Sequence, residues 1–232
     1  MRYAAPLVWG RLERRYKRFL ADVVLDSGER VLAHVPNSGA MRGCSENGSR
    51  CLLSRATNPC RALAWTLEQV IASGIPVGVN TARANALVEE ALRGRVALIP
   101  GLVEPWTLRR EVMISQHSRT DFCLTDPRGA TWVEVKSVSW AVDGVALFPD
   151  AVTSRGARHL AELAERVRGG ERAVLLYVVQ RGDASGVGVS PIDSVYTAAL
   201  VAARRASVTV IALQVAVAPG GLIPWRCLPV HG

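Results

Sequence analysis

Three side chains near the middle of the chain have the types and spacing of a metal-dependent hydrolytic site. Glu134 and Lys136 are two positions apart, and Asp121 precedes Glu134 by 13 positions. Two carboxylates can hold a hard divalent cation, Mg²⁺ or Mn²⁺, that polarises a phosphodiester. A nearby ammonium can orient the attacking water or stabilise the developing charge. The trio would suit metal-assisted phosphodiester hydrolysis, and the alternative interpretation is a surface strand with one ion pair. The local pattern alone does not name an enzyme.

The choice of lysine at position 136 is informative because this chain rarely uses lysine. Only two of the 28 basic residues, Lys17 and Lys136, are lysines, so 26 are arginines. Lysine differs from arginine in carrying a compact charge that can lose its proton. We therefore expect Lys136 to have a specific role.

Two strands joined by a tight turn position these side chains. Residues 119–124 and 132–136 are rich in β-branched and aromatic side chains, and the intervening Asp126-Pro127-Arg128-Gly129 is typical of a turn. Side chains alternate along a strand. Glu134 and Lys136 are therefore expected on one face, and Val133 and Val135 on the other.

The same region resembles the PD-(D/E)XK nuclease superfamily, with Thr120-Asp121 where the motif has Pro-Asp. The literal Pro149-Asp150 follows Lys136 and is in the wrong order. The wider chain is similar to the sugar fermentation stimulation protein (SfsA) family. This similarity is carried by residues 34–44 (HVPNSGAMRGC), 80–85 (NTARAN) and 148–156 (FPDAVTSRG).

The resemblance implies an α+β chain of two domains. Residues 1–80 would form an OB-like nucleic-acid-binding barrel, and residues 81–232 a PD-(D/E)XK nuclease-like domain with a mixed central sheet. It also implies further site groups. Glu111 and the Val135 carbonyl would add metal ligands, and the helix acid nearest the metal would be Glu90, for which an exposed ion pair is the alternative.

The composition favours a polyanionic partner. The 232 residues carry a formal net charge of +8, and the pI is near 9.8. Nucleic acid is the first expectation, DNA before RNA, and an anionic membrane surface the second. The arginine-rich composition is an alternative source of this charge.

Other features bear on compartment and assembly. No apolar run approaches the ~18 residues that cross a membrane, and the first residues lack the apolar block of a signal peptide. The five cysteines include no Cys-x-x-Cys, so we expect free thiols, no zinc and a cytoplasmic protein. A homodimer is a further expectation.

The first third of the chain has the pattern of a small barrel. Strands are expected at residues 7–19, 20–25, 30–35, 51–55, 63–70 and 76–79. The first strand interleaves cations with two aromatic rings, as a single-strand platform requires. Its predicted nucleic-acid-binding residues are Arg11, Arg14, Arg15, Tyr16, Lys17 and Arg18. Alternatively, Tyr16 and Phe19 enter the barrel core.

Three helices are expected in the second domain, at residues 82–93, 155–168 and 190–205, with a connector over 95–110. Arg155 and His159 share a polar face of the second helix and are predicted phosphate contacts, although a histidine on such a face is usually only solvated. Gln180 ends a buried strand at 173–180. Its side chain is expected to orient Lys136 or a metal-bound water. The alternative is an ordinary amide at the end of a strand.

These features support a DNA-binding protein with a divalent-metal-dependent nuclease site. The alternative is a non-catalytic DNA-binding transcriptional regulator of sugar-metabolism genes that retains the nuclease fold. A sugar-metabolism enzyme is not favoured, because the chain lacks a Gly-x-Gly-x-x-Gly phosphate loop.

Overall fold

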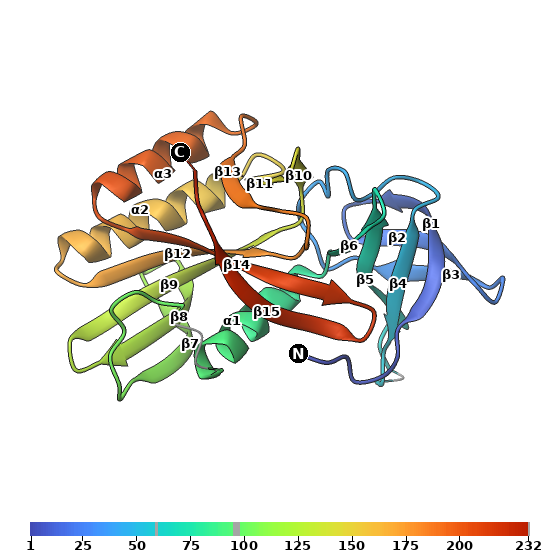
Figure 1. Ribbon diagram of the computed structural model, residues 1–232, viewed down its shortest axis with the longest axis horizontal. Coiled ribbons are helices and arrows are strands. Elements are labelled where there is room, and N and C mark those ends of the chain that lie inside the picture. The colour runs from blue at the N-terminus through green and yellow to red at the C-terminus, as the bar shows by residue number, and fades with distance from the viewer. Residues whose placement is uncertain (59, 95–97, 232) are drawn as a thin grey trace.

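The computed structural model describes residues 1–58, 60–94 and 98–231. Part of the predicted connector over residues 95–110 therefore lies outside the described residues. The chain forms an N-terminal barrel beside a larger mixed-sheet domain (Figure 1). The predicted α+β class is confirmed.

The barrel is a six-stranded sheet that closes on itself. Its strand order is β3-β2-β1-β4-β5-β6, and β3 also pairs with β5. Antiparallel hairpins bring neighbouring strands together, and the parallel β3–β5 contact closes the barrel. The strands are β1 (Val8–Tyr16), β2 (Leu20–Leu25), β3 (Arg30–His34), β4 (Arg50–Arg55), β5 (Trp65–Ala72) and β6 (Ile75–Gly78).

The first predicted strand is too long, because a tight turn interrupts it. β1 ends at Tyr16, which pairs with Leu20 of β2. Lys17 and Arg18 form the turn with positive φ angles of 48° and 62°. This turn lacks the glycine or asparagine that usually marks such a conformation. Phe19 is 46% exposed, so the expectation that this ring enters the core is wrong.

The second domain has a central six-stranded sheet of order β15-β14-β12-β9-β8-β7. Its strands are β7 (Thr107–Met113), β8 (Arg119–Asp126), β9 (Gly129–Val138), β12 (Arg172–Val179), β14 (Thr209–Ala218) and β15 (Gly221–Leu228). The strand β15 at the edge of this sheet pairs antiparallel with β14 and was not predicted from the sequence. A smaller sheet contains β10 (Ala141–Val142), β11 (Val145–Phe148) and β13 (Gly186–Val189).

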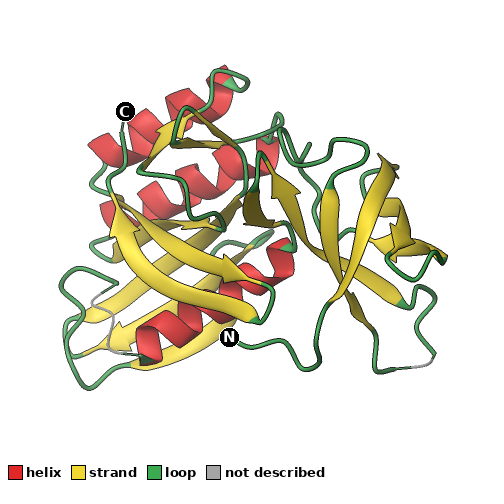
Figure 2. Ribbon diagram, turned by 45° about the vertical axis from the view of Figure 1, so that its right-hand side comes forward, coloured by secondary structure: helices red, strands yellow, loops and turns green. Residues whose placement is uncertain are grey.

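Helices cover both faces of this sheet (Figure 2). A short 3₁₀ turn, η1 (Thr81–Arg83), leads into α1 (Ala84–Arg93), which packs on one face. The helices α2 (Ser154–Arg168) and α3 (Ser194–Arg205) pack on the other. The third helix begins later than predicted because Asp193, rather than Ser190, caps it through the backbone N–H of Tyr196.

The predicted alternation along β9 is confirmed. Val133 and Val135 belong to the apolar cluster that includes α1, whereas Trp132 belongs to the cluster that includes α2 and α3. Glu134 therefore lies on the α2 side of the sheet, where it would be costly to bury without partners. The site depends on this placement.

The barrel is joined to the second domain by direct hydrogen bonds. The Gly78 N–H donates to the Gln180 carbonyl oxygen at 2.8 Å. From the opposite side of the junction, the Met41 N–H donates to Asp150 Oδ2 at 2.8 Å. The barrel therefore has a defined position relative to the sheet.

A buried carboxylate stabilises the segment that links the two domains. The Glu68 side chain in β5 is fully buried and accepts hydrogen bonds from Ser54, Asn80 and Arg83. Asn80 and Arg83 belong to the link, so Glu68 fixes the path of the chain into α1.

Replacing Arg83 with methionine is expected to lower the free energy of unfolding by about 3 kcal/mol, because Glu68 would keep a buried charge without its cation. Urea denaturation measures the change. The control is Arg30→Met, which removes the exposed partner of Glu13 and should cost less than about 1 kcal/mol. Equal losses in the two variants would contradict this account.

Candidate active site between the domains

A cleft of about 550 Å³ lies where the barrel meets the second domain. Arg18 and residues 37–39 line it from the barrel, and Thr81, Ala82, Ala84 and Asn85 line it from η1 and the start of α1. Asp121, residues 134–140 and residues 147–156 complete the wall. The cleft thus contains the predicted acid–acid–lysine trio.

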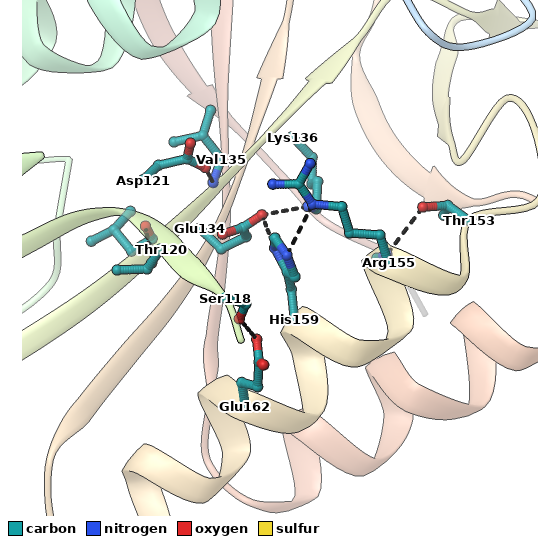
Figure 3. A network of polar contacts seen from close by, with 12 residues as sticks. Ser118, Thr120, Asp121, Glu134, Val135, Lys136, Thr153, Arg155, His159 and Glu162 are labelled. Carbon is teal, nitrogen blue, oxygen red and sulfur yellow. Dashed lines mark hydrogen bonds and ion pairs between the residues drawn. The ribbon is translucent and has the colours of Figure 1, made fainter. Parts of the chain in front are cut away.

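Glu134 is the most enclosed of the three. Its side chain is 6% exposed, and its Oε1 atom lies 2.5 Å from Lys136 Nζ. The same oxygen contacts Nδ1 of His159 in α2 (Figure 3). Both cation-capable partners therefore bind one oxygen of the carboxylate, and no hydrogen bond among the described residues involves Oε2.

These partners keep Glu134 ionised. Burial raises the pKa of its carboxyl, but the hydrogen bond from His159 and the charge of Lys136 outweigh burial, so the pKa lies below the ordinary value of 4.5. The cluster stabilises a charge that the apolar core could not hold alone.

Asp121 is held from the other side of the sheet. Asn85 Nδ2 of α1 donates to its Oδ1 at 2.8 Å, and the Val135 N–H donates to its Oδ2 at 2.8 Å. Burial and the nearby charge of Glu134 nevertheless raise the pKa of Asp121 above its usual 3.8. The two acids thus repel each other in the absence of a cation.

His159 is buried, with 3% of its surface exposed, so the expectation of a merely solvated histidine is wrong. Arg155, one turn earlier in α2, donates from Nε to His159 Nε2 at 3.2 Å. A nitrogen that accepts this bond carries no proton in neutral histidine, so the Nδ1–H donates to Glu134. Thr153 caps α2 by accepting from the Gly156 N–H.

Three predicted site residues, Glu111, Glu90 and Gln180, do not join the cluster. Glu111 lies between the β7 positions that pair with Phe122 and Thr120, but its side chain is exposed and does not line the cleft. Its φ of 50° interrupts the regular strand there. Glu90 binds the N-terminal ammonium instead.

Gln180 lies at the domain junction, outside the wall of the cleft. Its Nε2 donates to Ser137 Oγ at 2.8 Å, and its carbonyl oxygen accepts from the Gly78 N–H. An added Cβ at Gly78 would come within 2.6 Å of Gln180 Oε1, so the two strands require glycine to approach this closely. The position matches the strand-end alternative and does not bring Gln180 to Lys136.

The structure separates the predicted nucleic-acid contacts into two groups. Arg14 pairs with Asp22, which also accepts from Tyr16. Arg15 donates to three carbonyl oxygens of residues 37–40, and Arg11 donates to the Gly48 carbonyl oxygen. Among the described residues, the side chains of Lys17 and Arg18 have no hydrogen-bond or ion-pair partner. The turn, rather than the strand, offers free cations.

Asn85 is a site residue to which sequence reasoning assigned no role. It lies within the 80–85 motif, where Ala84, Leu87 and Val88 form the core face of α1. A polar residue beside that face, in the first turn of the helix, could have indicated a specific polar contact. Its partner on a distant strand was not visible in the local pattern.

The residues present fit a divalent cation. Each Asp121 oxygen accepts one hydrogen bond and keeps a free lone pair, and Glu134 Oε2 is also available as a ligand. The described ranges contain no preformed group of three or more His, Cys, Asp or Glu side chains suited to a metal. A cation here would complete its shell with water, main-chain oxygen or substrate.

Comparisons with known proteins agree with the two-part architecture. The family model described as "SfsA N-terminal OB domain" matches residues 14–79. The model described as "Sugar fermentation stimulation protein RE domain" matches residues 82–221. The chain belongs to the sugar fermentation stimulation protein family.

Relatives in this SfsA family match over nearly the whole chain. The homolog from Alkalilimnicola ehrlichii is 49% identical and covers 100% of this chain and 99% of its own. That from Geobacter sulfurreducens is 48% identical and covers 97% and 96%. Both are described as sugar fermentation stimulation protein homologs.

A solved SfsA structure has the same fold. Pyrococcus furiosus SfsA, determined in complex with Ca²⁺, gives a TM-score of 0.86 at 22% identity and covers 100% of this chain and 98% of its own. In the part of the chain that the structure describes, no helix has the length and apolarity to span a membrane.

The repulsion between the two acids is measurable. In metal-free protein we expect the carboxyl ¹³C signal of Asp121 to titrate above pH 3.8, and Glu134→Gln to lower that midpoint by removing a nearby charge. Because the folded pKa is raised, the stability that Asp121 contributes is complete below its unfolded pKa and is lost as pH rises through the folded pKa. An unchanged midpoint in Glu134→Gln would contradict the proposed repulsion.

Proposed function

We propose that this SfsA family member is a divalent-metal-dependent phosphodiesterase that cleaves nucleic acid, DNA before RNA, in the interdomain cleft. The observation that carries the proposal is the enclosed cluster of Asp121, Glu134 and Lys136 at this cleft. Mg²⁺ or Mn²⁺ is the proposed cofactor.

The charges support a cation between the acids. Two carboxylates repel a phosphate, so a protein of net charge +8 gains nothing by placing them in a nucleic-acid cleft without a metal. The raised pKa of Asp121 reflects the same unfavourable field. The Ca²⁺ in the Pyrococcus furiosus SfsA complex is a hard, oxygen-binding cation of the kind that these two acids suit.

Each residue then has a definable role. When bound, the cation would polarise the phosphodiester and lower the pKa of a bound water. His159 and Lys136 hold one oxygen of Glu134, which leaves the other oxygen available as a ligand. Asn85 and the Val135 N–H donate to different oxygens of Asp121 and so fix its orientation, and each oxygen keeps a lone pair for ligation. The Val135 carbonyl is a further proposed ligand.

Lys136 would donate to the phosphate oxygen that gains charge during attack. Its side chain is 14% exposed, and its ammonium is held beside Glu134. Arg155 is exposed at the start of α2 and lines the same cleft, so it is placed to contact a neighbouring phosphate. A non-catalytic regulator would have no need for an enclosed lysine held beside Glu134 in this cleft.

Glu134→Gln is expected to weaken Mn²⁺ binding by about 100-fold, because a neutral amide replaces a charged carboxylate ligand. Calorimetry measures the affinity, and a gel assay in Mg²⁺ or Mn²⁺ with single- and double-stranded DNA and RNA measures cleavage. Both should be lost together. Glu165→Gln, which neutralises an acid 70% exposed, is the matched control and should retain both.

Nucleic-acid binding without metal uptake or cleavage in the wild type would refute the proposal. It would leave a binding protein that keeps the fold without the chemistry.

Lys136→Met is expected to retain Mn²⁺ binding but to reduce cleavage by roughly 10²–10³-fold, as when one donor to a developing charge is removed. Lys136→Arg should not restore the rate, since the planar guanidinium cannot occupy the position of a compact ammonium. Single-turnover rates at saturating metal separate the two effects. Full activity in Lys136→Arg would show that only the charge matters.

A further inference from the structure

The cleft continues into a second hollow on the barrel. This hollow, of about 380 Å³, is lined by residues 15–18, at the end of β1 and in the turn that follows, and by Asn47. Four residues line both hollows: Arg18, Ser38, Gly39 and Ala151. The two hollows are therefore continuous, and an extended ligand bound at Asp121 and Glu134 could follow them past the Ser38–Gly39 loop onto the barrel. We call the two hollows together the groove.

The groove carries cations that the fold does not use. Lys17 and Arg18 are exposed at the turn, and within the described ranges their side chains have no polar partner. Arg14 and Arg15, immediately before them, are by contrast committed to Asp22 and to loop carbonyls. The turn thus leaves two charges available for a ligand.

Both lysines of the chain line the groove. Lys136 lies in the cleft and Lys17 in the second hollow, although 26 of the 28 basic residues are arginines. Aromatic rings accompany them: the half-buried Trp140 lines the cleft, and Tyr16 lines the second hollow. Free cations beside aromatic rings are the elements of single-strand binding.

The size of the groove favours one strand over two. A cleft of about 550 Å³ is in the range that encloses one drug-sized molecule, so it can enclose a nucleotide or two but not a duplex. Glu134 is only 4% exposed, so a backbone that contacts it must enter the cleft rather than lie across its mouth.

We infer that the groove binds single-stranded nucleic acid, with Lys17 and Arg18 holding phosphates on the barrel side of the Ser38–Gly39 loop. The inference rests on the proposed function for the class of ligand. It adds the strandedness of the substrate, its path from the acids onto the barrel, and the two residues that bind it away from the reacting phosphate.

The test is fluorescence anisotropy of a labelled 10-nucleotide oligothymidylate in EDTA, where no metal-dependent cleavage occurs. The variant is Lys17→Asn/Arg18→Asn, since asparagine tolerates the positive φ of both positions. We expect about tenfold weaker binding at low salt, and a log–log salt slope shallower by about 1.4, because two phosphate contacts are lost.

The control is Arg168→Gln/Arg205→Gln, which removes two exposed charges at the ends of α2 and α3. It lowers the net charge equally and should bind like the wild type. The same oligonucleotide annealed to its complement should bind at least about tenfold more weakly.

Equal affinity for duplex and single strand, or no difference between the turn variant and the control, would overturn the inference. Absence of binding to every oligonucleotide would also overturn it. Binding is measured without metal and cleavage with it, so the two proposals fail separately. Binding that depends on the turn, without cleavage, would support single-strand binding in the groove and refute the proposed nuclease activity. Cleavage that the turn variant leaves unchanged would support the nuclease activity and refute the role of the turn.

Discussion

The candidate site depends on the interactions that keep the carboxylate of Glu134 ionised although it is buried. A buried carboxylate without partners would take up a proton, so the ionised form requires Lys136 from the same strand and His159 from α2. His159 is in place only because α2 lies across that face of the sheet. Thr153, which caps α2, donates its N–H to Asp193, the cap of α3. The position of one carboxylate is therefore tied to the packing of both C-terminal helices.

The second acid is supported from the opposite face. Asn85 of α1 reaches Asp121 at the edge of β8, so two helices on opposite faces of the sheet meet at one pair of carboxylates. The two acids differ in electrostatic balance. The pKa of Glu134 is lowered by the hydrogen bond from His159 and the charge of Lys136, whereas burial and repulsion from Glu134 raise the pKa of Asp121. A divalent cation would relieve this imbalance, since neither Asn85 nor the Val135 N–H carries a full charge.

Local patterns predicted the elements well, because alternation and helical periodicity are short-range properties. They placed Glu134 opposite Val133 and Val135 and gave the core faces of α1 and α2. They could not reveal which helix covers which strand. The burial of His159, the partner of Asn85 and the place of Gln180 at the junction all depend on contacts between residues far apart in sequence. The β1–β2 turn was missed because its left-handed residues are a lysine and an arginine rather than glycine or asparagine.

The barrel shapes the cleft as well as adjoining it. Arg15, a predicted phosphate contact, instead binds the carbonyl oxygens of residues 37, 39 and 40 and so fixes the loop that forms one wall. Asp150 holds the same loop from the second domain through the Met41 N–H. An added Cβ at Gly39 would come within 2.4 Å of Asp150 Oδ1, so this contact requires glycine. This wall and the α2 N-terminus both line the cleft that contains Glu134, so the domain junction sets what could enter it, while the sheet holds the two acids in place.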